Sequence, residues 1–483
     1  MIKYRELAYY LFFLMLFGFR AIGGHDGWTS YRWFLMAGGL FFLIKVFSTS
    51  HSILEYLVMA LLLILAGIVY LRSGEKGLLL DIMMMIGIKG VSEKKLFHLS
   101  AIFLGISMIV LVFLSVFGIL PDVQFGPYGL RFVDLVMMRR SLGYPHVNTL
   151  MTTYIILLML IMYQIGNTDK KTVIRYSSIL FFGAVYLFLY SDSITGILMS
   201  GAYLILNYLF QFCRFDGPVQ RILIYILYPV VNVTVFIGMA MYLPRDAALR
   251  AGNSFGERFR IAAMYWKEMP VTMFGSRLVI PTDRGELYGI DISQIHLFLN
   301  LGIVAFLVVS LLYMIVLREM FAMKNRGALA IIVTLMIMGI SDPLLYNLSC
   351  KNLTFIFMGM GLYRVLSNRS KERLSILKKE ILLFSAGERA IPARISLRFE
   401  KVNQKISRII KDGKPGKHVK YLAVGCAIIV AMVYAFWMHP YIEPIMNSYE
   451  AGWFEYVRTT ISIGVFGFLL MYALLHLRAS KRM

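Results

Sequence analysis

The chain has 483 residues, of which 59% are hydrophobic and 16% are charged, and its mean hydropathy is +0.71. A water-exposed domain could not carry so apolar a surface, so these values exclude a soluble protein and predict an all-α polytopic membrane protein. The positive residues behind the formal net charge of +22 are spread over short loops between apolar runs, with the largest block in one late segment. That distribution favours positive-inside topology and contact with anionic lipid, and we expect no nucleic-acid partner.

The amino-terminal stretch, MIKYRELAYYLFFLMLFGF, has a basic lead and an apolar run without a small-residue cleavage pattern, so we interpret it as a retained first helix. Runs long enough to cross about 30 Å of hydrocarbon lie at roughly 7–22, 31–47, 53–71, 99–120, 147–165, 176–190, 196–212, 222–243, 293–316, 328–345, 352–366, 420–438 and 458–477. The run 78–88 is shorter and contains Asp81, so it is either a short span or a re-entrant segment.

Charge placement favours a crossing for this short run. If it crosses and the amino end is cytoplasmic, the basic loops all fall on the inside, as the positive-inside rule requires. These loops are 89–95, 170–175, 214–221, 318–326 and 364–420. The sequence therefore predicts about fourteen membrane-spanning helices with both ends in the cytoplasm.

Two longer loops fall outside, at 121–146 and 244–292, and both are rich in arginine. Together they hold nine arginines and one lysine, whereas 364–420 holds seven arginines and nine lysines. A guanidinium is a planar fork that grips phosphate or carboxylate at two points, and an ammonium is a hydrated point charge. The outer loops therefore predict an anion-handling site at the extracytoplasmic surface.

The segment after the membrane core is strongly basic. Apolar residues recur in it at helical spacing, which predicts one or two amphipathic helices on the anionic inner leaflet. These residues are Leu374, Leu377, Ile381 and Phe384, and then Ile395, Phe399, Val402, Ile406 and Ile409. We divide the chain into a core over 1–366, this segment over 367–419, and a two-helix membrane hairpin over 420–483 whose connection is an aromatic, Pro-containing turn.

The three cysteines, Cys213, Cys350 and Cys426, lie far apart and lack metal-ligand spacing. Neither a disulfide framework nor a metal site is predicted.

Three stretches resemble the motifs of one family. Residues 140–149, RSLGYPHVNT, resemble the R-S-x-G-[FY]-x-H-P-N motif of bacterial Wzy-type polysaccharide repeat-unit polymerases, with Val147 in place of the usual proline. Residues 256–260, GERFR, followed by Trp266, Pro270 and FGS at 274–276, are similar to the pattern of their large outer loop. DISQIH at 291–296, with Leu301 and Gly302, is similar to the start of their next helix. The resemblance covers about 1–366 in topology and 131–302 in motifs.

The resemblance implies a fold of the GT-C type, related to the O-antigen ligases, in the bacterial cytoplasmic membrane. It implies transfer of a growing glycan from one undecaprenyl pyrophosphate carrier to a second lipid-linked oligosaccharide, without a metal or cofactor. A chain-length regulator and a flippase are the partners that it implies.

Elementary electrostatics points the same way. A departing pyrophosphate builds negative charge at the bilayer surface, which preorganised arginine donors can stabilise. Arg258 is our preferred catalytic arginine, and Arg260, two residues on, points to another face and is expected to pair with Glu257 or Glu268. The other candidate substrate-binding residues are Arg131, Arg139, Arg140, Asn148, Arg260, Arg277 and Gln294. The candidates for accepting the proton of the attacking hydroxyl are Asp291, Glu257, His146 and His296.

Structural alternatives stay open for several of these residues. Asn148 and Asp291 could each cap a helix, and a cap position would lower the pKa of Asp291. His296 could hydrogen-bond between helices, and turn chemistry alone explains Ser191–Gly196. For the whole chain, the alternatives are a ligase that moves a finished glycan to another acceptor, a flippase or transporter, and a noncatalytic scaffold.

Overall fold

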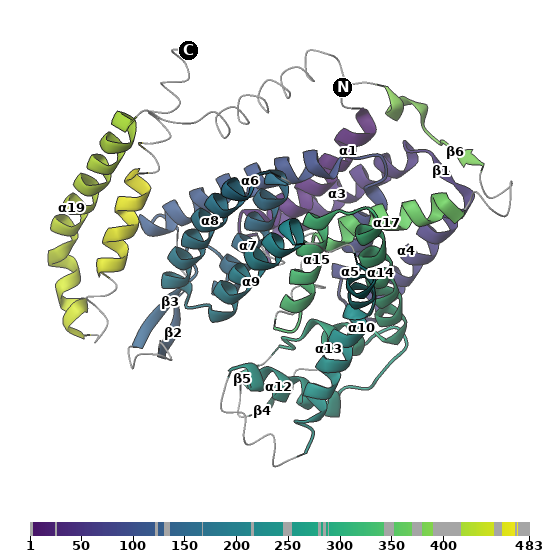
Figure 1. The fold of residues 1–483 in the computed structure, drawn as a ribbon. Helices are drawn as coiled ribbons and strands as arrows, with labels where there is room; N and C mark the ends of the chain where they lie inside the picture. Colours follow the sequence, from purple (N-terminus) through teal and green to yellow (C-terminus); the bar gives the residue numbers. More distant parts are fainter. Residues whose placement is uncertain are drawn as a thin grey trace.

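The computed structural model describes most of the chain as packed helices (Figure 1). The described residues are 3–24, 27–120, 124–129, 136–166, 168–213, 217–244, 254–278, 282–283, 286–287, 289–341, 352–369, 379–389, 417–448, 456–468 and 471. Within them, eight helices are long and apolar enough to cross a membrane: α3 (Thr29–Phe47), α4 (Ile53–Ser73), α6 (Glu93–Val116), α7 (Val147–Ile165), α8 (Lys170–Ser191), α9 (Ile194–Phe212), α10 (Pro218–Ala240) and α14 (Ile303–Ala322). The predicted helical, multi-pass membrane protein is confirmed, whereas fourteen spans and a GT-C type fold stay predictions.

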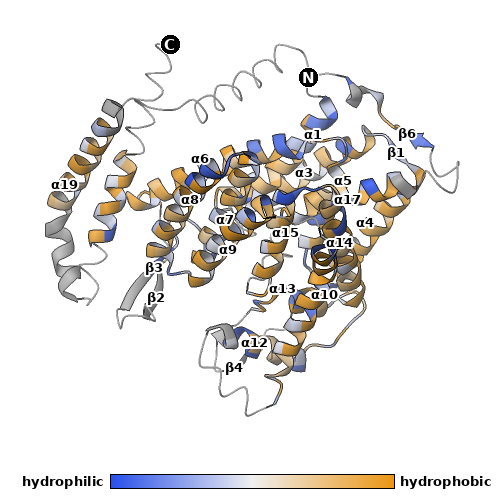
Figure 2. Ribbon diagram, in the orientation of Figure 1, coloured by the Kyte–Doolittle hydropathy of each residue, from blue (hydrophilic) through white to orange (hydrophobic). Residues whose placement is uncertain are grey.

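Shorter elements complete the bundle. The helices are α1 (Tyr4–Phe13), continued by a π-helical turn (Leu14–Gly18) and α2 (Phe19–Ala21), then α5 (Gly77–Gly87), α12 (Ser254–Glu268), α13 (Ser293–Leu299), α15 (Arg326–Met338), α17 (Thr354–Arg369), α19 (Lys417–Ser448) and a terminal helix over 456–468. The antiparallel strand pairs are β1 (His51–Ser52) with β6 (Glu380–Ile381), β2 (Gln124–Gly129) with β3 (Val136–Arg140), and β4 (Thr282–Asp283) with β5 (Glu286–Leu287). Apolar residues cover the bundle helices, and hydrophilic residues concentrate near their ends (Figure 2).

Helix α7 is the centre of the bundle. Of the residues in its most apolar stretch, 67% are buried, which is the largest share among the eight long helices of the described chain. It packs against α6, α8 and α9. The Tyr154 hydroxyl donates to the carbonyl of Leu180 on α8 at 2.6 Å, which satisfies its polar group inside the bundle. The start of α7, which carries the Arg140–Thr149 motif, is therefore held on a rigid element.

Helix α5 is the short apolar run that contains Asp81. Its 11 residues reach only about 16 Å. The Lys76 ammonium, before α5, lies 4.8 Å from the Tyr31 ring near the start of α3. After α5, the Lys89 carbonyl accepts a hydrogen bond from Lys45 Nζ at 2.7 Å, near the end of α3. Helix α5 thus joins opposite ends of α3, which supports the crossing interpretation over the re-entrant one.

Three of the predicted basic loops, 89–95, 170–175 and 318–326, lie at one end of the bundle. Gln164 at the end of α7 donates to the Lys94 carbonyl at 2.7 Å. The Lys170 ammonium lies 5.7 Å from the ring of Phe212 at the end of α9. Contacts of this kind link 89–95, 168–175, 211–213 and 318–326, which we call the basic face. The amino end lies at the same end of the molecule, while α12 and the β2–β3 hairpin lie at the other (Figure 1).

We expect the basic face to be cytoplasmic. In a background in which Cys213, Cys350 and Cys426 are replaced by serine, a cysteine at the exposed Lys267 of α12 should react with an impermeant thiol reagent on intact cells. A cysteine at the exposed Lys171, on the basic face, should react only after permeabilisation. The reverse pattern would invert the topology.

The predicted single span over 293–316 is wrong, because the chain breaks between α13 and α14. Gly302 adopts φ +92° and Gly275 adopts φ +87° where the loop before α13 packs against the chain between α13 and α14. The loop satisfies the freed backbone groups, since Ile303 N donates to the Thr272 carbonyl at 3.0 Å and Ser276 N to the Asn300 carbonyl at 3.1 Å. The outer loop is thereby fastened to the membrane bundle.

Replacing Gly302 by alanine should destabilise the protein strongly. A Cβ there would lie 2.3 Å from the backbone nitrogen of Gly275, and the positive φ alone costs roughly 1–3 kcal/mol. The thermal unfolding midpoint in detergent should fall well below that of wild type. Gly67→Ala is the matched control, because a Cβ at Gly67 meets nothing within 4 Å. Equal midpoints for the two variants would contradict the role of this crossing.

The predicted amphipathic helix around Ile381 and Phe384 is also wrong. Residues 380–381 form β6, which pairs with His51 and Ser52, and Phe384 N donates to the Phe47 carbonyl at 2.9 Å. These partners take up backbone groups that a helix would have bonded internally. Leu374, Leu377 and the apolar series from Ile395 to Ile409 lie outside the described residues. The predicted turn of the terminal hairpin is shorter than expected, because α19 continues to Ser448.

Candidate functional site

Helix α12 lies in the predicted outer loop and covers the end of α10. Its apolar face, including Phe259 and Tyr265, is buried in a core cluster with residues of α10 and α13. The Trp266 ring stacks on Phe298 with centroids 5.5 Å apart, and Phe298 meets Phe236 of α10 edge-on at 5.4 Å. Aromatic packing of this kind fixes the helix on the bundle and so fixes the direction of its arginines.

The Arg258 side chain extends from α12 and contacts two residues on different elements. Its Nε lies 3.6 Å from Asp291 Oδ2, and its Nη2 donates to Thr195 Oγ1 at 3.5 Å. Only 17% of the Arg258 side chain is exposed. The guanidinium therefore bridges the end of the outer loop and the turn between α8 and α9.

That turn, Ser191–Gly196, also contacts Asn148 of the Arg140–Thr149 motif and Arg139, the residue just before the motif. Arg139 Nε donates to the Ser191 carbonyl at 2.8 Å, and Ser193 Oγ donates to Asn148 Oδ1 at 3.3 Å. Asp192 adopts the left-handed conformation with φ +47°, which lets the chain reverse tightly. The structure thus brings Arg139, Asn148 and Arg258 to one five-residue stretch, 191–195.

His146, not Asn148, caps α7. Its Nδ1 accepts the backbone N–H of Asn148 at 3.1 Å, so the lone pair that a general base would use on that nitrogen is engaged. Burial lowers the pKa of His146, and the positive charge of Arg139 lowers it further. The cap explains the position of His146, and the Asn148 side chain faces Ser193 instead of capping the helix.

Asp291 differs from the expectation of a helix cap with a lowered pKa. The cap of α13 is Ile292, which makes no side-chain capping bond. Surrounding protein desolvates the carboxylate and raises the pKa of Asp291, although Arg258 opposes the shift. Its side chain keeps 41% of its surface exposed, so it combines access from outside with a raised pKa, and both suit a general base.

His296 and Gln294 lie inside the bundle. They are 2% and 1% exposed, so neither side chain is accessible from solvent in this structure. His296 Nε2 lies 3.1 Å from Asn300 Nδ2, and Gln294 Nε2 donates to the Met336 carbonyl at 3.4 Å. These contacts indicate a structural role for both residues, although the His296 contact lies within α13 and its C-cap, not between helices as expected.

The remaining predicted arginines, four in number, each have a different environment. Arg260 donates from Nε to both carboxylate oxygens of Glu257 at 2.9 Å, which is the pairing expected for one of the two arginines of α12. Arg277 is exposed, and Arg140 interacts electrostatically with Tyr190 of α8. Arg131 lies outside the described residues.

Sequence reasoning missed Thr195 and Arg458. Thr195 was attributed to turn chemistry, although a hydroxyl facing an outer arginine was a usable signal. Arg458 begins the last predicted span. It is 4% exposed, its Nη1 donates to the Leu189 carbonyl at 2.6 Å, and its guanidinium lies 4.5 Å from the Tyr190 ring. Arg139 and Arg458 together satisfy carbonyls at the end of α8 and complement its dipole.

Within the described residues, no group of three His, Cys, Asp or Glu side chains is placed to hold a metal ion. Comparisons of the chain with protein-family models, with curated proteins and with solved structures found no match.

Proposed function

We propose that this chain is a membrane glycosyltransferase that polymerises undecaprenyl-pyrophosphate-linked oligosaccharide units on the extracytoplasmic face of the bacterial cytoplasmic membrane. The observation that carries the proposal is the placement of Arg258 between Thr195 and Asp291, opposite the basic face. Arg139 reaches the same turn. Two arginines and an accessible carboxylate with a raised pKa are the groups that the reaction requires.

The proposed chemistry assigns one role to each group. Arg258 and the Thr195 hydroxyl donate to the diphosphate oxygen on which charge develops as the bond between the sugar carbon and that oxygen breaks. A hydroxyl of the second sugar forms the new bond to that carbon, and Asp291 accepts its proton. The diphosphate leaves on its lipid, and Asp291 returns the proton to solvent.

An apolar groove beside the site supports a lipid-linked substrate. It has a volume of about 630 Å³ and lies between α10 and α14, with Tyr228, Phe236, Phe298 and Phe306 among its lining residues. Phe298 also stacks on Trp266 of α12, the helix that carries Arg258. A prenyl chain in this groove would lie beside α12, the helix that carries Arg258.

The test is reconstitution of the purified chain with lipid-linked repeat units. A ladder of longer glycans on the lipid, formed also in EDTA, is the expected product. In cells lacking the gene, single repeat units should accumulate on the carrier. Long unattached chains would instead indicate a ligase, and units trapped on the inner leaflet would indicate a flippase.

A further inference from the structure

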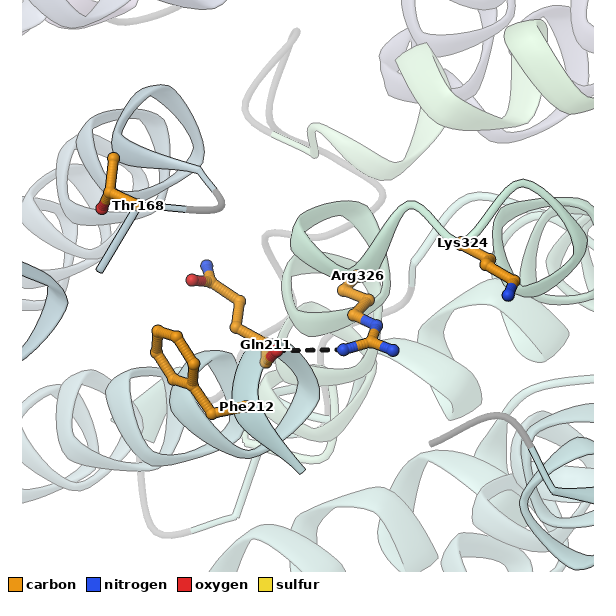
Figure 3. Close-up of a pocket in the computed structure, with 5 residues that line it drawn as sticks. All are labelled: Thr168, Gln211, Phe212, Lys324 and Arg326. Atoms are coloured by element: carbon orange, nitrogen blue, oxygen red, sulfur yellow. Dashed lines mark hydrogen bonds between the residues drawn. The ribbon is translucent and has the colours of Figure 1, made fainter. Parts of the chain in front are cut away.

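A polar cavity lies on the basic face, at the other end of the bundle from α12 and Arg258. It has a volume of about 290 Å³ and is formed where the α7–α8 loop, the end of α9 and the α14–α15 loop meet. Figure 3 shows its lining residues, which are Thr168, Gln211, Phe212, Lys324 and Arg326. Because the lining residues come from the α7–α8 loop, α9, the α14–α15 loop and α15, the cavity is built by the bundle and is not a feature of one loop.

Positive charge dominates the cavity wall. Lys324 and Arg326 line it, and the Lys170 ammonium lies 5.7 Å from the ring of Phe212 on the adjacent wall. Helix α15 begins at Arg326, so its amino-terminal dipole adds to the positive potential. The neighbouring Asp169 is occupied as a helix cap, because its carboxylate accepts the Thr172 N–H at 3.0 Å.

Arg326 is held rigidly at this wall. Its Nη1 donates to the backbone carbonyl of Gln211 at 3.0 Å (Figure 3). That bond ties the start of α15 to the end of α9 and fixes the guanidinium beside the cavity. A preorganised guanidinium loses little entropy when it binds a phosphate.

The Gln211 side chain supplies a separate indication of a ligand. It is 8% exposed, and its Nε2 donates to Asn207 Oδ1 at 2.9 Å. Its Oε1 is buried without a hydrogen-bond partner among the described residues. Figure 3 shows this side chain extending into the space between Thr168 and Arg326. A buried acceptor without a donor is destabilising, so a ligand hydroxyl that donates to it would be stabilising.

We propose that this cavity binds a phosphate ester that carries a free hydroxyl. Lys324 and Arg326 hold the phosphate through charge-assisted hydrogen bonds, and the ligand hydroxyl donates to Gln211 Oε1. Such chemistry occurs in the glycerol phosphate headgroup of an inner-leaflet phospholipid and in a soluble glycerol phosphate. The site is independent of Arg258, so it would bind its ligand whether or not the chain is a polymerase.

Two binding measurements on the full purified chain in detergent distinguish these sources. Native mass spectrometry after incubation with equal amounts of phosphatidylglycerol and phosphatidylcholine reports lipid preference. Thermophoresis with glycerol 1-phosphate at constant ionic strength reports the soluble ester. Retention of phosphatidylglycerol alone assigns the site to a lipid headgroup, and saturable binding of glycerol 1-phosphate assigns it to a soluble ligand.

Lys324→Gln and Gln211→Leu should each weaken the observed binding about tenfold, which corresponds to one lost hydrogen bond to a charged or buried group. Arg221→Gln is the matched control, because Arg221 is an exposed cation near the start of α10 and does not line the cavity. If Gln211→Leu fails to fold, Lys324→Gln at an exposed position carries the test alone. Absence of binding in both measurements overturns the proposal, as does an equal loss in Arg221→Gln.

Discussion

Arg258→Lys should lower glycan polymerisation by about 10²–10³-fold while the protein still folds and inserts. A lysine keeps the positive charge but loses the planar fork that reaches Thr195 and Asp291 together. The expected magnitude is that of removing one preorganised donor from an oxyanion site. The measurement is the initial rate of chain extension by the purified variant on lipid-linked repeat units.

Arg318→Lys is the matched control for this substitution. Arg318 also pairs with an acid, since its Nη2 lies 2.9 Å from Glu319 Oε1, but it lies on the basic face. The control should extend glycans at a rate within about twofold of wild type, because the Arg318 side chain is half-exposed and a lysine there keeps the positive charge beside Glu319. Normal product lengths in Arg258→Lys, or an equal loss in both variants, would remove Arg258 from the mechanism.

Most of what the sequence predicted about the site came from the excess of arginine over lysine in the two outer loops. It directed attention to the two outer loops, and the structure brings Arg139 of one loop and Arg258 of the other to the same turn. The pairing of Arg260 with Glu257 was also predictable, because residues three apart on a helix share a face. Charge type and helical geometry are local properties, so a sequence shows them.

Long-range contacts were not predictable in this way. By hydropathy, residues 293–316 form one apolar run. The break of the helix at Gly302 depends on contacts with residues 272–276 of the preceding loop. The helical spacing of Ile381 and Phe384 was real, yet the backbone there pairs with His51 and Ser52, more than three hundred residues earlier. A pattern within one segment does not reveal the partner that competes for its backbone.

The environment of Asp291, and with it the direction of its pKa shift, was also not predictable from the sequence. From sequence, a carboxylate just before a helix indicated a cap with a lowered pKa, because helix starts favour negative charge. In the fold, Ile292 is the cap, and desolvation by the surrounding protein raises the pKa of Asp291. The sign of the shift depends on which neighbours crowd the group, and only the tertiary structure supplies them.

Asp291→Asn should lower the polymerisation rate by about 10²–10⁴-fold, the range for loss of a positioned general base. In the wild type the reaction requires ionised Asp291, so the rate should fall as pH falls through the pKa of Asp291. That pKa is raised, so the fall should occur at higher pH than for an ordinary aspartate. The pH–rate profile of the reconstituted enzyme measures it, and the residual activity of Asp291→Asn should lack this acid limb.

Arg258→Gln extends the same test. Arg258 lowers the pKa of Asp291, so its removal should move the acid limb of the remaining activity to still higher pH. Glu268→Gln, at an exposed acid of α12, is the control and should leave both rate and profile unchanged. An unshifted acid limb in Arg258→Gln, or one that persists in Asp291→Asn, would show that another group takes the proton. A shifted limb would tie the carboxylate and the guanidinium, 3.6 Å apart, to a single reacting centre.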